Sequence, residues 1–426
     1  MSPVPPLPDP TWAALPTRTS APPGGSARAA AVARLQAWAL EGGARLDGVA
    51  LSVDAAGDGA VRAARAIAVG ERLLAIPRAL MVRDDELAAT ATGAIDLGPE
   101  VAGPRDALAV WLPLEARRPD SRWRAFLDVQ PAAFADLPMF RGGDELAPLA
   151  GTAARRAAAA AHADVVDTYA RLPVALRAQV SLADYAWGRA IVASRGFNAP
   201  DTLDDRVAFI PVADLFNHHP GQTRWQYDPL TAVWSVEARR AFAAGDEVHF
   251  DYGAKGNTAL LVGYGFALPD NPATAVALAL PGAPAITVTA RFDDDARAAL
   301  ATARRRAAGL GPVDDDDDDA WRGVEVERAA MTMLAAAALT AHDRIAPPDD
   351  TPASDSWRRS CSVVRAGERA VLAATAAFAR AAIAHLAAPT RAALVATADA
   401  LAPTPHGPDA LLRGYLRAAA DALVVG

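Results

Sequence analysis

Short strand-like runs occur in two blocks of this chain, and a long helical stretch separates the blocks. The first block lies between Val49 and Ile76 and the second between Arg206 and Tyr252, whereas residues 84 to about 194 form helical sequence rich in alanine and arginine. A doubly wound α/β chain would alternate strands and helices regularly. The order of the blocks therefore predicts an α+β fold in which a helical insertion interrupts the β-rich part.

Turn residues delimit the strands that we expect. Gly57-Asp58-Gly59 predicts a tight turn between two of them, and Asp228-Pro229 predicts the turn of a hairpin. The expected strands are Val49–Val53, Ala60–Ala64, Arg72–Ile76, Val207–Ile210, Arg224–Tyr227, Ala232–Val236 and Glu247–Tyr252.

Helix signals mark the start of the chain and the end of the insertion. Residues 26–44 place Val32 and Leu35 on one side of a helix that stops at Gly42-Gly43. Ser181 and Asp184 have the spacing of a capping box, which begins a helix that runs to about residue 194.

Composition divides the chain into three parts. Residues 1–27 include a proline-rich stretch without apolar periodicity, and we expect a flexible tail. Residues 28–270 hold the β-rich part with its insertion, and residues 271–426 are predicted to form an all-helical domain. The acidic run Asp314–Asp319 and the stretch Pro347–Pro352 are expected to be solvated loops in that domain.

Charge and cysteine content exclude several classes of protein. A net charge of −8 argues against a protein that binds nucleic acid through a basic surface. The single cysteine, Cys361, excludes a disulfide framework and suits a reducing compartment, so we expect a cytoplasmic protein. The uncharged apolar run of residues 329–341 is shorter than the ~20 residues that a membrane span needs, and no secretory signal is evident at the N-terminus.

The stretch Ala213–Gly221, ADLFNHHPG, gathers an acid, an amide and two imidazoles at the end of an apolar run. A metal is one interpretation, with Asp214, His218, His219, His249 and Asp251 as possible ligands. Adjacent histidines on an extended segment point to opposite sides, which disfavours that interpretation, and we predict no metal. Polar side chains that only tie down a buried loop are the plainer alternative.

A hydrolase is a weaker interpretation of the same sequence. The chain has no G-x-S-x-G stretch, Cys361 lies in the helical C-terminal part, and Ser194 has no evident base beside it.

A second polar cluster favours a cofactor site instead. GDEVHFDYG (Gly245–Gly253) is followed by KGN, LL and YGF up to Phe266. Together with ADLFNH these motifs resemble, in order and spacing, the SET-domain methyltransferases, and most of all the branch of Rubisco large-subunit lysine methyltransferase and actin-histidine methyltransferase. Arg65–Pro77, WRAFLDVQPAAF (Trp123–Phe134), Glu145–Thr152 and SRGFN (Ser194–Asn198) extend the resemblance over roughly residues 30 to 270.

The resemblance implies a SET fold with a pseudoknot, in which one segment threads through a loop, and a cofactor, S-adenosyl-L-methionine. Asn217 and His218 match the family's cofactor-binding pair. The other residues that the resemblance implies for cofactor binding are Asp58, Gly59, Ala60, Arg195 and Phe266. From the residues alone, Arg195 equally fits a helix C-terminal charge and Phe266 a core aromatic.

Tyr252 matches the family's catalytic tyrosine, whose hydroxyl would orient the attacking nitrogen. The residues implied for substrate binding are Phe197, Asn198, Asp214, Tyr227 and Tyr264. Asp214 equally fits a helix-capping aspartate. The family's plant branch has a second arginine four residues after the position of Arg195, where this chain has Ala199, so we expect a different substrate.

The implied activity is methyl transfer to the lysine amine of a non-histone protein, with that protein as the partner and neither nucleic acid nor membrane involved. A lysine must arrive as the neutral amine, and burial beside a sulfonium assists its loss of a proton. Two alternatives stay open: methylation of a protein histidine, and a non-catalytic SET-like module that binds a protein.

Overall fold

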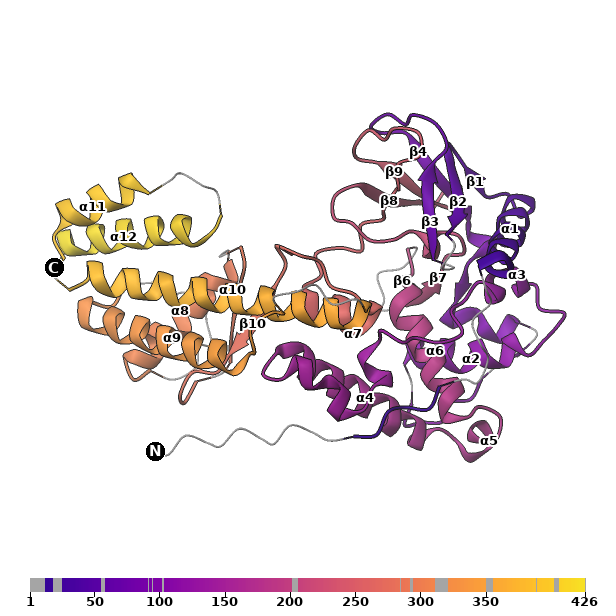
Figure 1. Ribbon diagram of the computed structural model, residues 1–426, viewed down its shortest axis with the longest axis horizontal. Helices are drawn as coiled ribbons and strands as arrows, with labels where there is room; N and C mark the ends of the chain where they lie inside the picture. The colour runs from indigo at the N-terminus through magenta and orange to yellow at the C-terminus, as the bar shows by residue number, and fades with distance from the viewer. Residues whose placement is uncertain are drawn as a thin grey trace. The chain divides into compact units, whose positions relative to one another are not determined.

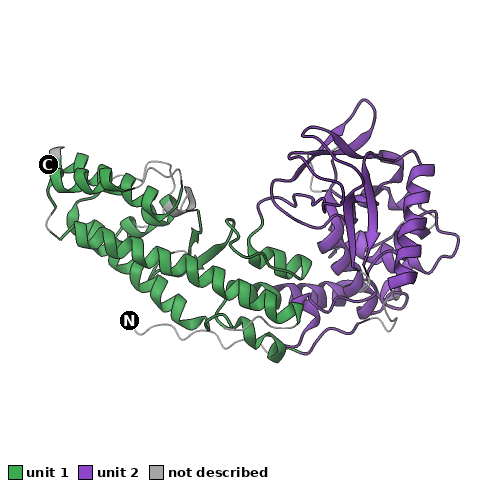
Figure 2. Ribbon diagram, turned by 45° about the horizontal axis from the view of Figure 1, so that its top comes forward, with its two compact units in different colours: residues 1–12, 143–159, 255–426 green, residues 13–142, 160–254 purple. Residues whose placement is uncertain are grey.

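The computed structural model describes residues 12–17, 25–54, 58–90, 92–93, 95–101, 103–200, 206–283, 285–291, 294–310, 321–349, 355–387, 389–401 and 406–425. The chain divides into two compact units (Figure 2). Unit 1 comprises Met1–Trp12, Gly143–Ala159 and Lys255–Gly426, and unit 2 comprises Ala13–Gly142 and Ala160–Ala254. The helical unit thus begins at Lys255 and takes in part of the insertion, whereas the sequence placed the boundary after residue 270.

Unit 2 contains most of the strands (Figure 1). Its strands are β1 (Arg45–Leu46), β2 (Val49–Val53), β3 (Gly59–Ala63), β4 (Arg72–Pro77), β5 (Val82–Arg83), β6 (Gly196–Asn198), β7 (Val207–Phe209), β8 (Thr223–Asp228) and β9 (Val233–Ala238). Its helices are α1 (Gly25–Glu41), α2 (Pro104–Ala116), α3 (Arg124–Asp128), α5 (Val174–Arg177), α6 (Leu182–Arg195) and the greater part of α4 (Ala153–Arg171).

The strands of unit 2 form small antiparallel sheets. In the described residues, one sheet has the order β1-β4-β9-β8, another has the order β5-β7-β6, and β2 pairs with β3. The hairpin of β8 and β9 sets Asp228 opposite Val233, so the turn falls at Asp228-Pro229, as predicted. Since β4 and β5 precede the helical insertion and β6 to β9 follow it, the strands from before and after the insertion pair with one another, as the sequence indicated.

Residues 247–252 differ from the prediction, because they form no continuous strand. Glu247 pairs singly with Arg62, and the Val248 N–H donates to the Val61 carbonyl at 2.8 Å. Phe250 pairs singly with His218, in parallel. The segment thus leaves β3 after Val248 and joins a different neighbour at Phe250, so no ladder develops.

The capping box at the start of α6 is confirmed. The Ser181 hydroxyl accepts from the Asp184 N–H at 3.1 Å and donates to the Asp184 carboxylate at 2.8 Å. Helix α6 then packs closely on α2: a Cβ on Gly188 would lie 2.1 Å from the Ala109 carbonyl oxygen. Only glycine permits this approach, which fixes the path of α6 toward its last residue, Arg195.

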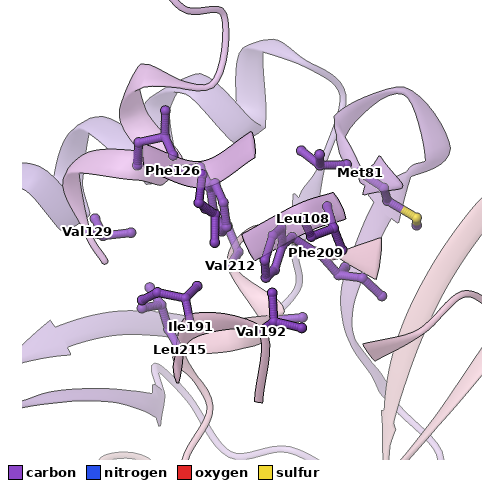
Figure 3. Packing of buried hydrophobic residues seen from close by; sticks show 14 of the residues in the cluster. Met81, Leu108, Phe126, Val129, Ile191, Val192, Phe209, Val212 and Leu215 are labelled. Atoms are coloured by element: carbon purple, nitrogen blue, oxygen red, sulfur yellow. The ribbon is translucent and has the colours of Figure 1, made fainter. Parts of the chain in front are cut away.

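The core of unit 2 joins the insertion to the strands (Figure 3). Leu108 of α2, Ile191 and Val192 of α6 and Phe209 of β7 are all less than 2 % exposed. The Phe126 ring of α3 lies 5.5 Å from that of Phe209. Helices α2, α3 and α6 of the insertion therefore share a core with the strands that carry the candidate site.

Part of the predicted tail is packed. Of residues 1–27 the structure describes 12–17 and 25–27, and Leu15 is only 4 % exposed within the core of unit 2. The Ala13 carbonyl accepts from the His162 imidazole at 3.0 Å. Residues 25–27 begin α1, which ends at Glu41 ahead of Gly43 (φ +88°), as the glycine stop predicted.

Unit 1 is mainly helical, as expected. Its remaining elements are α7 (Asn257–Tyr264), β10 (Ala275–Leu278), β11 (Ile286–Thr289), α8 (Asp294–Ala307), α9 (Val324–Arg344), α10 (Ser356–His385), α11 (Arg391–Ala400) and α12 (Pro408–Val425). The hairpin of β10 and β11 was not predicted. The run Asp314–Asp319 lies outside the described residues. No helix in the described ranges combines the length and the apolar character that crossing a membrane requires.

Candidate functional site

Two segments that lie about thirty residues apart in sequence run side by side in unit 2. The Phe250 N–H donates to the Asn217 carbonyl at 2.8 Å, and the His219 N–H donates to the Phe250 carbonyl at 3.2 Å. These bonds flank the parallel pair of His218 and Phe250. The two polar clusters of the sequence, ADLFNHH and VHFDY, therefore meet in space. We call this contact of residues 217–219 with residues 250–252 the crossing.

Tyr252 and His218 pack against each other at the crossing. Their rings stack with centroids 4.7 Å apart and an interplanar angle of 20°. The Tyr252 hydroxyl donates to the Phe216 carbonyl at 2.7 Å, so its proton is directed at the main chain. The lone pairs of the hydroxyl oxygen are consequently the part of the group that can accept from a ligand.

His218 is buried and is held in one tautomer. Its Nδ1 lies 3.1 Å from both the Phe250 carbonyl and the Tyr252 N–H. Because the Tyr252 N–H can only donate, we assign Nδ1 as its acceptor. Burial lowers the pKa of His218, although the Phe250 carbonyl and Asp251 act in the opposite direction. Burial therefore favours the neutral imidazole.

This lowered pKa predicts a pH-dependent stability. A histidine with a folded pKa below its unfolded value of 6.5 binds fewer protons when folded, so acid destabilises the folded state. We expect the melting temperature to fall more steeply from about pH 7.5 to about pH 5.5 in the wild type than in His218→Gln. Scanning calorimetry over this range measures the difference, and equal slopes would contradict it. His249, whose pKa burial also lowers, is present in both proteins and cancels.

Asn217 links the crossing to the turn before β3. Its amide nitrogen donates to the Gly59 carbonyl at 3.1 Å and to the Glu247 carboxylate at 2.8 Å. Gly59 and Ala60 begin β3, and the Asp58 carbonyl accepts from the Asp54 N–H at 3.0 Å. The structure thus brings four of the residues predicted to bind the cofactor to one place, since Asp58 and Ala60 flank the Gly59 that Asn217 contacts.

Arg195 and Asp214 form a pair behind the crossing. One guanidinium nitrogen of Arg195 donates to the Asp214 carbonyl at 2.7 Å and lies 3.4 Å from its carboxylate. The Asp214 side chain has no exposed surface, and burial raises its pKa while Arg195 acts in the opposite direction. Asp214 lies inside a short 3₁₀ helix, η5 (Ala213–Leu215), and makes no capping bond, which excludes the capping interpretation.

Several aromatic rings pack against one another beside the crossing. The Phe197 ring on β6 lies 5.7 Å from that of Trp234 and 5.8 Å from that of Phe250. Tyr227 on β8 pairs with Trp234 and is half-buried against the core, and Asn198 at the end of β6 is exposed. Three of the residues predicted to bind substrate therefore lie on strands of unit 2.

Tyr264 and Phe266 belong to unit 1. Tyr264 ends α7, its ring lies 6.2 Å from that of Phe266, and the Lys255 ammonium lies 5.9 Å from its centroid. Their roles in substrate and cofactor binding stay predictions. Across the residues that the structure describes, no cluster of three or more His, Cys, Asp or Glu side chains could hold a metal ion.

Solved structures share this arrangement of elements. The SET domain of LSMT bound to lysine and AdoHcy superimposes with a TM-score of 0.67 at 19% identity, over 84% of this chain and 92% of that chain. Rubisco LSMT bound to AdoMet superimposes with a TM-score of 0.66 at 20% identity, over 84% and 93%. The chain has the SET fold. The fold class expected from the motifs, including the helical C-terminal region, is thereby confirmed.

Sequence comparison gives the same relationship. The chain is 27% identical to the actin-histidine N-methyltransferase of Rhinolophus ferrumequinum and 26% identical to that of Homo sapiens, each over 255 residues. These matches cover 56% of this chain and 42% of each relative, so the chain spans less than half of the length of the curated relatives it matches. No family model matches the chain. The resemblance to this branch of SET-domain methyltransferases, stated above on the motifs, is confirmed.

Two polar residues of this SET fold contact predicted site residues, and a third interacts with them through its charge, but all three were missed in the sequence. Glu247 binds the Asn217 amide, and Gln130 donates to the Asp214 carboxylate at 3.2 Å. Arg28 of α1 is a partly buried cation whose charge interacts with those of Arg195 and Asp214. Glu247 had a signal, since it stands within GDEVHFDYG. For Gln130, the sequence feature that could have indicated a role is a lone amide at the end of an apolar helix before a proline. No feature of the sequence indicated a role for Arg28.

Proposed function

We propose that this protein transfers a methyl group from S-adenosyl-L-methionine to the lysine amine of a non-histone protein. The observation that carries the proposal is the crossing, which brings Asn217, His218 and Tyr252 together from two separate segments. The SET fold supports it, because solved structures with this fold hold AdoMet, or AdoHcy with lysine. A cytoplasmic location and the absence of a nucleic-acid partner stay predictions from composition and charge.

The residues at the crossing fit the cofactor. The Arg195 Nε atom is buried and has no hydrogen-bond partner within the described part of the chain, and such a donor fits a carboxylate like that of an amino acid. Asn217 is exposed and adjoins the main chain of Gly59. We assign Arg195, Asn217, His218 and the main chain of residues 58–60 to cofactor binding, and Phe266 joins them on the resemblance alone.

The bound cofactor would supply an activated methyl group on a sulfonium, so the protein has no strong electrophile to create. Its residues must position a neutral nitrogen and exclude water. The Tyr252 hydroxyl, whose proton is held by the Phe216 carbonyl, presents an acceptor that can orient an N–H of the nucleophile. Neutral His218 keeps a second positive charge away from the sulfonium.

The substrate side is assigned to the aromatic residues beside the crossing. Phe197 and Tyr227 offer apolar surface for the stem of a lysine, and Asn198 offers a polar group. The Asp214 side chain has no exposed surface, so its place on the substrate side rests on the resemblance alone. Tyr264 is added from the resemblance. A desolvated lysine loses its proton more readily, so this surface would favour the reactive amine.

Methylation of a protein histidine is the second candidate. It is favoured by the names of the curated relatives, which are actin-histidine N-methyltransferases. The exposed Asn198 beside Phe197 could hydrogen-bond an imidazole that stacks on the ring.

Transfer from methyl-labelled S-adenosylmethionine to cell lysate proteins tests both candidates. Acid hydrolysis of the labelled protein and amino-acid analysis should give methyl-lysine, whereas methylhistidine would replace the first candidate by the second. Isothermal titration with S-adenosylhomocysteine is the companion measurement. Cofactor binding without any labelled product would favour the non-catalytic binding module, and absence of binding at millimolar ligand would refute methyl transfer.

A further inference from the structure

Gln130 reaches from the helical insertion to the residues behind the crossing. It follows α3 at the end of the stretch Arg124–Asp128 and is only 5 % exposed. Its amide nitrogen donates to the Phe126 carbonyl at 3.0 Å and to the Asp214 carboxylate at 3.2 Å. Both amide protons are thereby used on acceptors that are themselves fixed, which sets the orientation of the side chain.

The main chain around Gln130 is held on both sides. The Val129 carbonyl accepts from the guanidinium of Arg28 on α1, and the Pro131 carbonyl accepts from the Trp187 indole on α6 at 2.7 Å. Neighbouring residues are therefore anchored to two different helices. The amide of Gln130 has little freedom to move away from Asp214, so its hydrogen bond is preorganised.

Asp214 connects this anchor to the catalytic tyrosine predicted above. It lies in η5, which leads directly into Phe216, and the Phe216 carbonyl accepts the Tyr252 hydroxyl proton at 2.7 Å. Its main-chain carbonyl and its carboxylate both contact Arg195. A displacement of the Asp214 side chain would therefore shift Arg195. It would also shift the Phe216 carbonyl, which orients the Tyr252 hydroxyl.

The ionised form of the Asp214 carboxyl is stabilised by few groups. The charged groups that face it are Arg195 from α6 and Arg28 from α1. Burial raises the pKa of Asp214, and Arg195, Gln130 and Arg28 each act to lower it. A hydrogen bond to the ionised form favours that form, so loss of the Gln130 donor would favour the protonated acid.

We propose that Gln130 is a positioning residue that holds the Asp214 carboxylate against Arg195 and so aligns both segments of the crossing. The proposal rests on the proposed function for its kinetic effect, but the hydrogen bond can be tested without turnover. Its role is to connect the helical insertion to the site.

Gln130→Leu removes the amide while keeping a side chain of similar length. We expect the carboxyl of Asp214 to titrate at higher pH than in the wild type, followed by carbon-13 NMR of labelled aspartate and assigned by its absence in Asp214→Asn. In methyl transfer we expect KM for the protein substrate to rise about tenfold below the titration midpoint of Asp214 that the NMR measures in the variant, and the defect to shrink as the pH rises through that midpoint.

Two further variants keep the test decisive. Gln179→Leu is the matched control, because the Gln179 amide donates to the Ala175 carbonyl at 3.1 Å on an exposed surface, and it should titrate and turn over like the wild type. Gln130→Glu keeps the shape but places an acid beside Asp214, and it should also raise the titration midpoint. It replaces Gln130→Leu if that variant does not fold.

An Asp214 midpoint that is unchanged in folded Gln130→Leu or Gln130→Glu overturns the proposal, whether or not the protein transfers methyl groups. A KM defect of the same size at every pH also overturns it, since a merely structural loss would not follow the ionisation of Asp214. Failure of the wild type to transfer methyl would count against the proposed function alone, because the titration is independent of it.

Discussion

Tyr252→Phe is expected to reduce the turnover number for methyl transfer by about 10²-fold or more, the usual cost of removing one oriented polar group from a reacting centre. The phenylalanine ring can keep the stacking on His218, whose centroid lies 4.7 Å away. What it loses is the hydroxyl oxygen, which is aimed by the hydrogen bond to the Phe216 carbonyl. We therefore expect the affinity for S-adenosylhomocysteine, measured by isothermal titration, to change far less than turnover.

Tyr169→Phe is the matched control for this prediction. The Tyr169 hydroxyl also donates to a main-chain carbonyl, that of Val180 at 3.1 Å, but Tyr169 lies on α4 in the helical insertion. Each variant removes one such bond, which is worth about 1 kcal/mol in stability. A loss of turnover in Tyr252→Phe no greater than in Tyr169→Phe would show that the hydroxyl has no part in the reaction.

The order of motifs predicted the fold and the crossing, because SET-like sequences carry both polar clusters at local, readable positions. Asn217, His218 and Tyr252 lie at the crossing, as the motifs predicted. The α6 cap at Ser181 was predicted separately, from the spacing of Ser181 and Asp184. Local pattern was less informative where tertiary pairing decides the structure. Residues 247–252 looked like one strand, but Glu247 and Phe250 bind different neighbours, and alternation of side chains cannot show where a partner changes.

The hairpin of β10 and β11 was missed for a related reason. Residues 275–280 read AVALAL, and a short apolar run does not distinguish a strand from a buried helix. The turn signal was present in Pro281-Gly282, where Gly282 has a φ of +68°. The sequence on both sides of this turn is helical in composition, and this composition favoured a helix over a hairpin at residues 275–289.

Outside the crossing, the long-range polar contacts of the site could not be predicted. The bond from Gln130 to Asp214 spans 84 residues and that from Asn217 to Gly59 spans 158. Nothing local in either sequence identifies its partner. Such contacts form only when the helices and the strands of unit 2 are packed in one core. This packing is therefore what positions the polar groups of the site.

Glu327→Gln is expected to destabilise unit 1 by about 3–5 kcal/mol, which is the usual result of removing one charge from a buried ion pair. Glu327 of α9 has no exposed side-chain surface and lies 2.8 Å from the guanidinium of Arg304 on α8, which is 4 % exposed. The Tyr415 hydroxyl of α12 donates to the same carboxylate at 3.0 Å. The carboxylate thus joins three helices, and its neutral amide would remove the negative charge that lies against the buried Arg304 guanidinium.

Glu325→Gln on the same helix is the control. The Glu325 side chain is 87% exposed and lies 3.6 Å from Arg328, and such surface pairs contribute at most about 1 kcal/mol. Scanning calorimetry of the whole chain, with amide hydrogen exchange of peptides from α8, α9 and α12, should show a large loss for Glu327→Gln only. The double variant Arg304→Met/Glu327→Leu removes both charges and should recover much of the loss, because the desolvation cost disappears with them. If the double variant were less stable than Glu327→Gln, the loss would have to come from packing rather than from breaking the pair of Arg304 and Glu327.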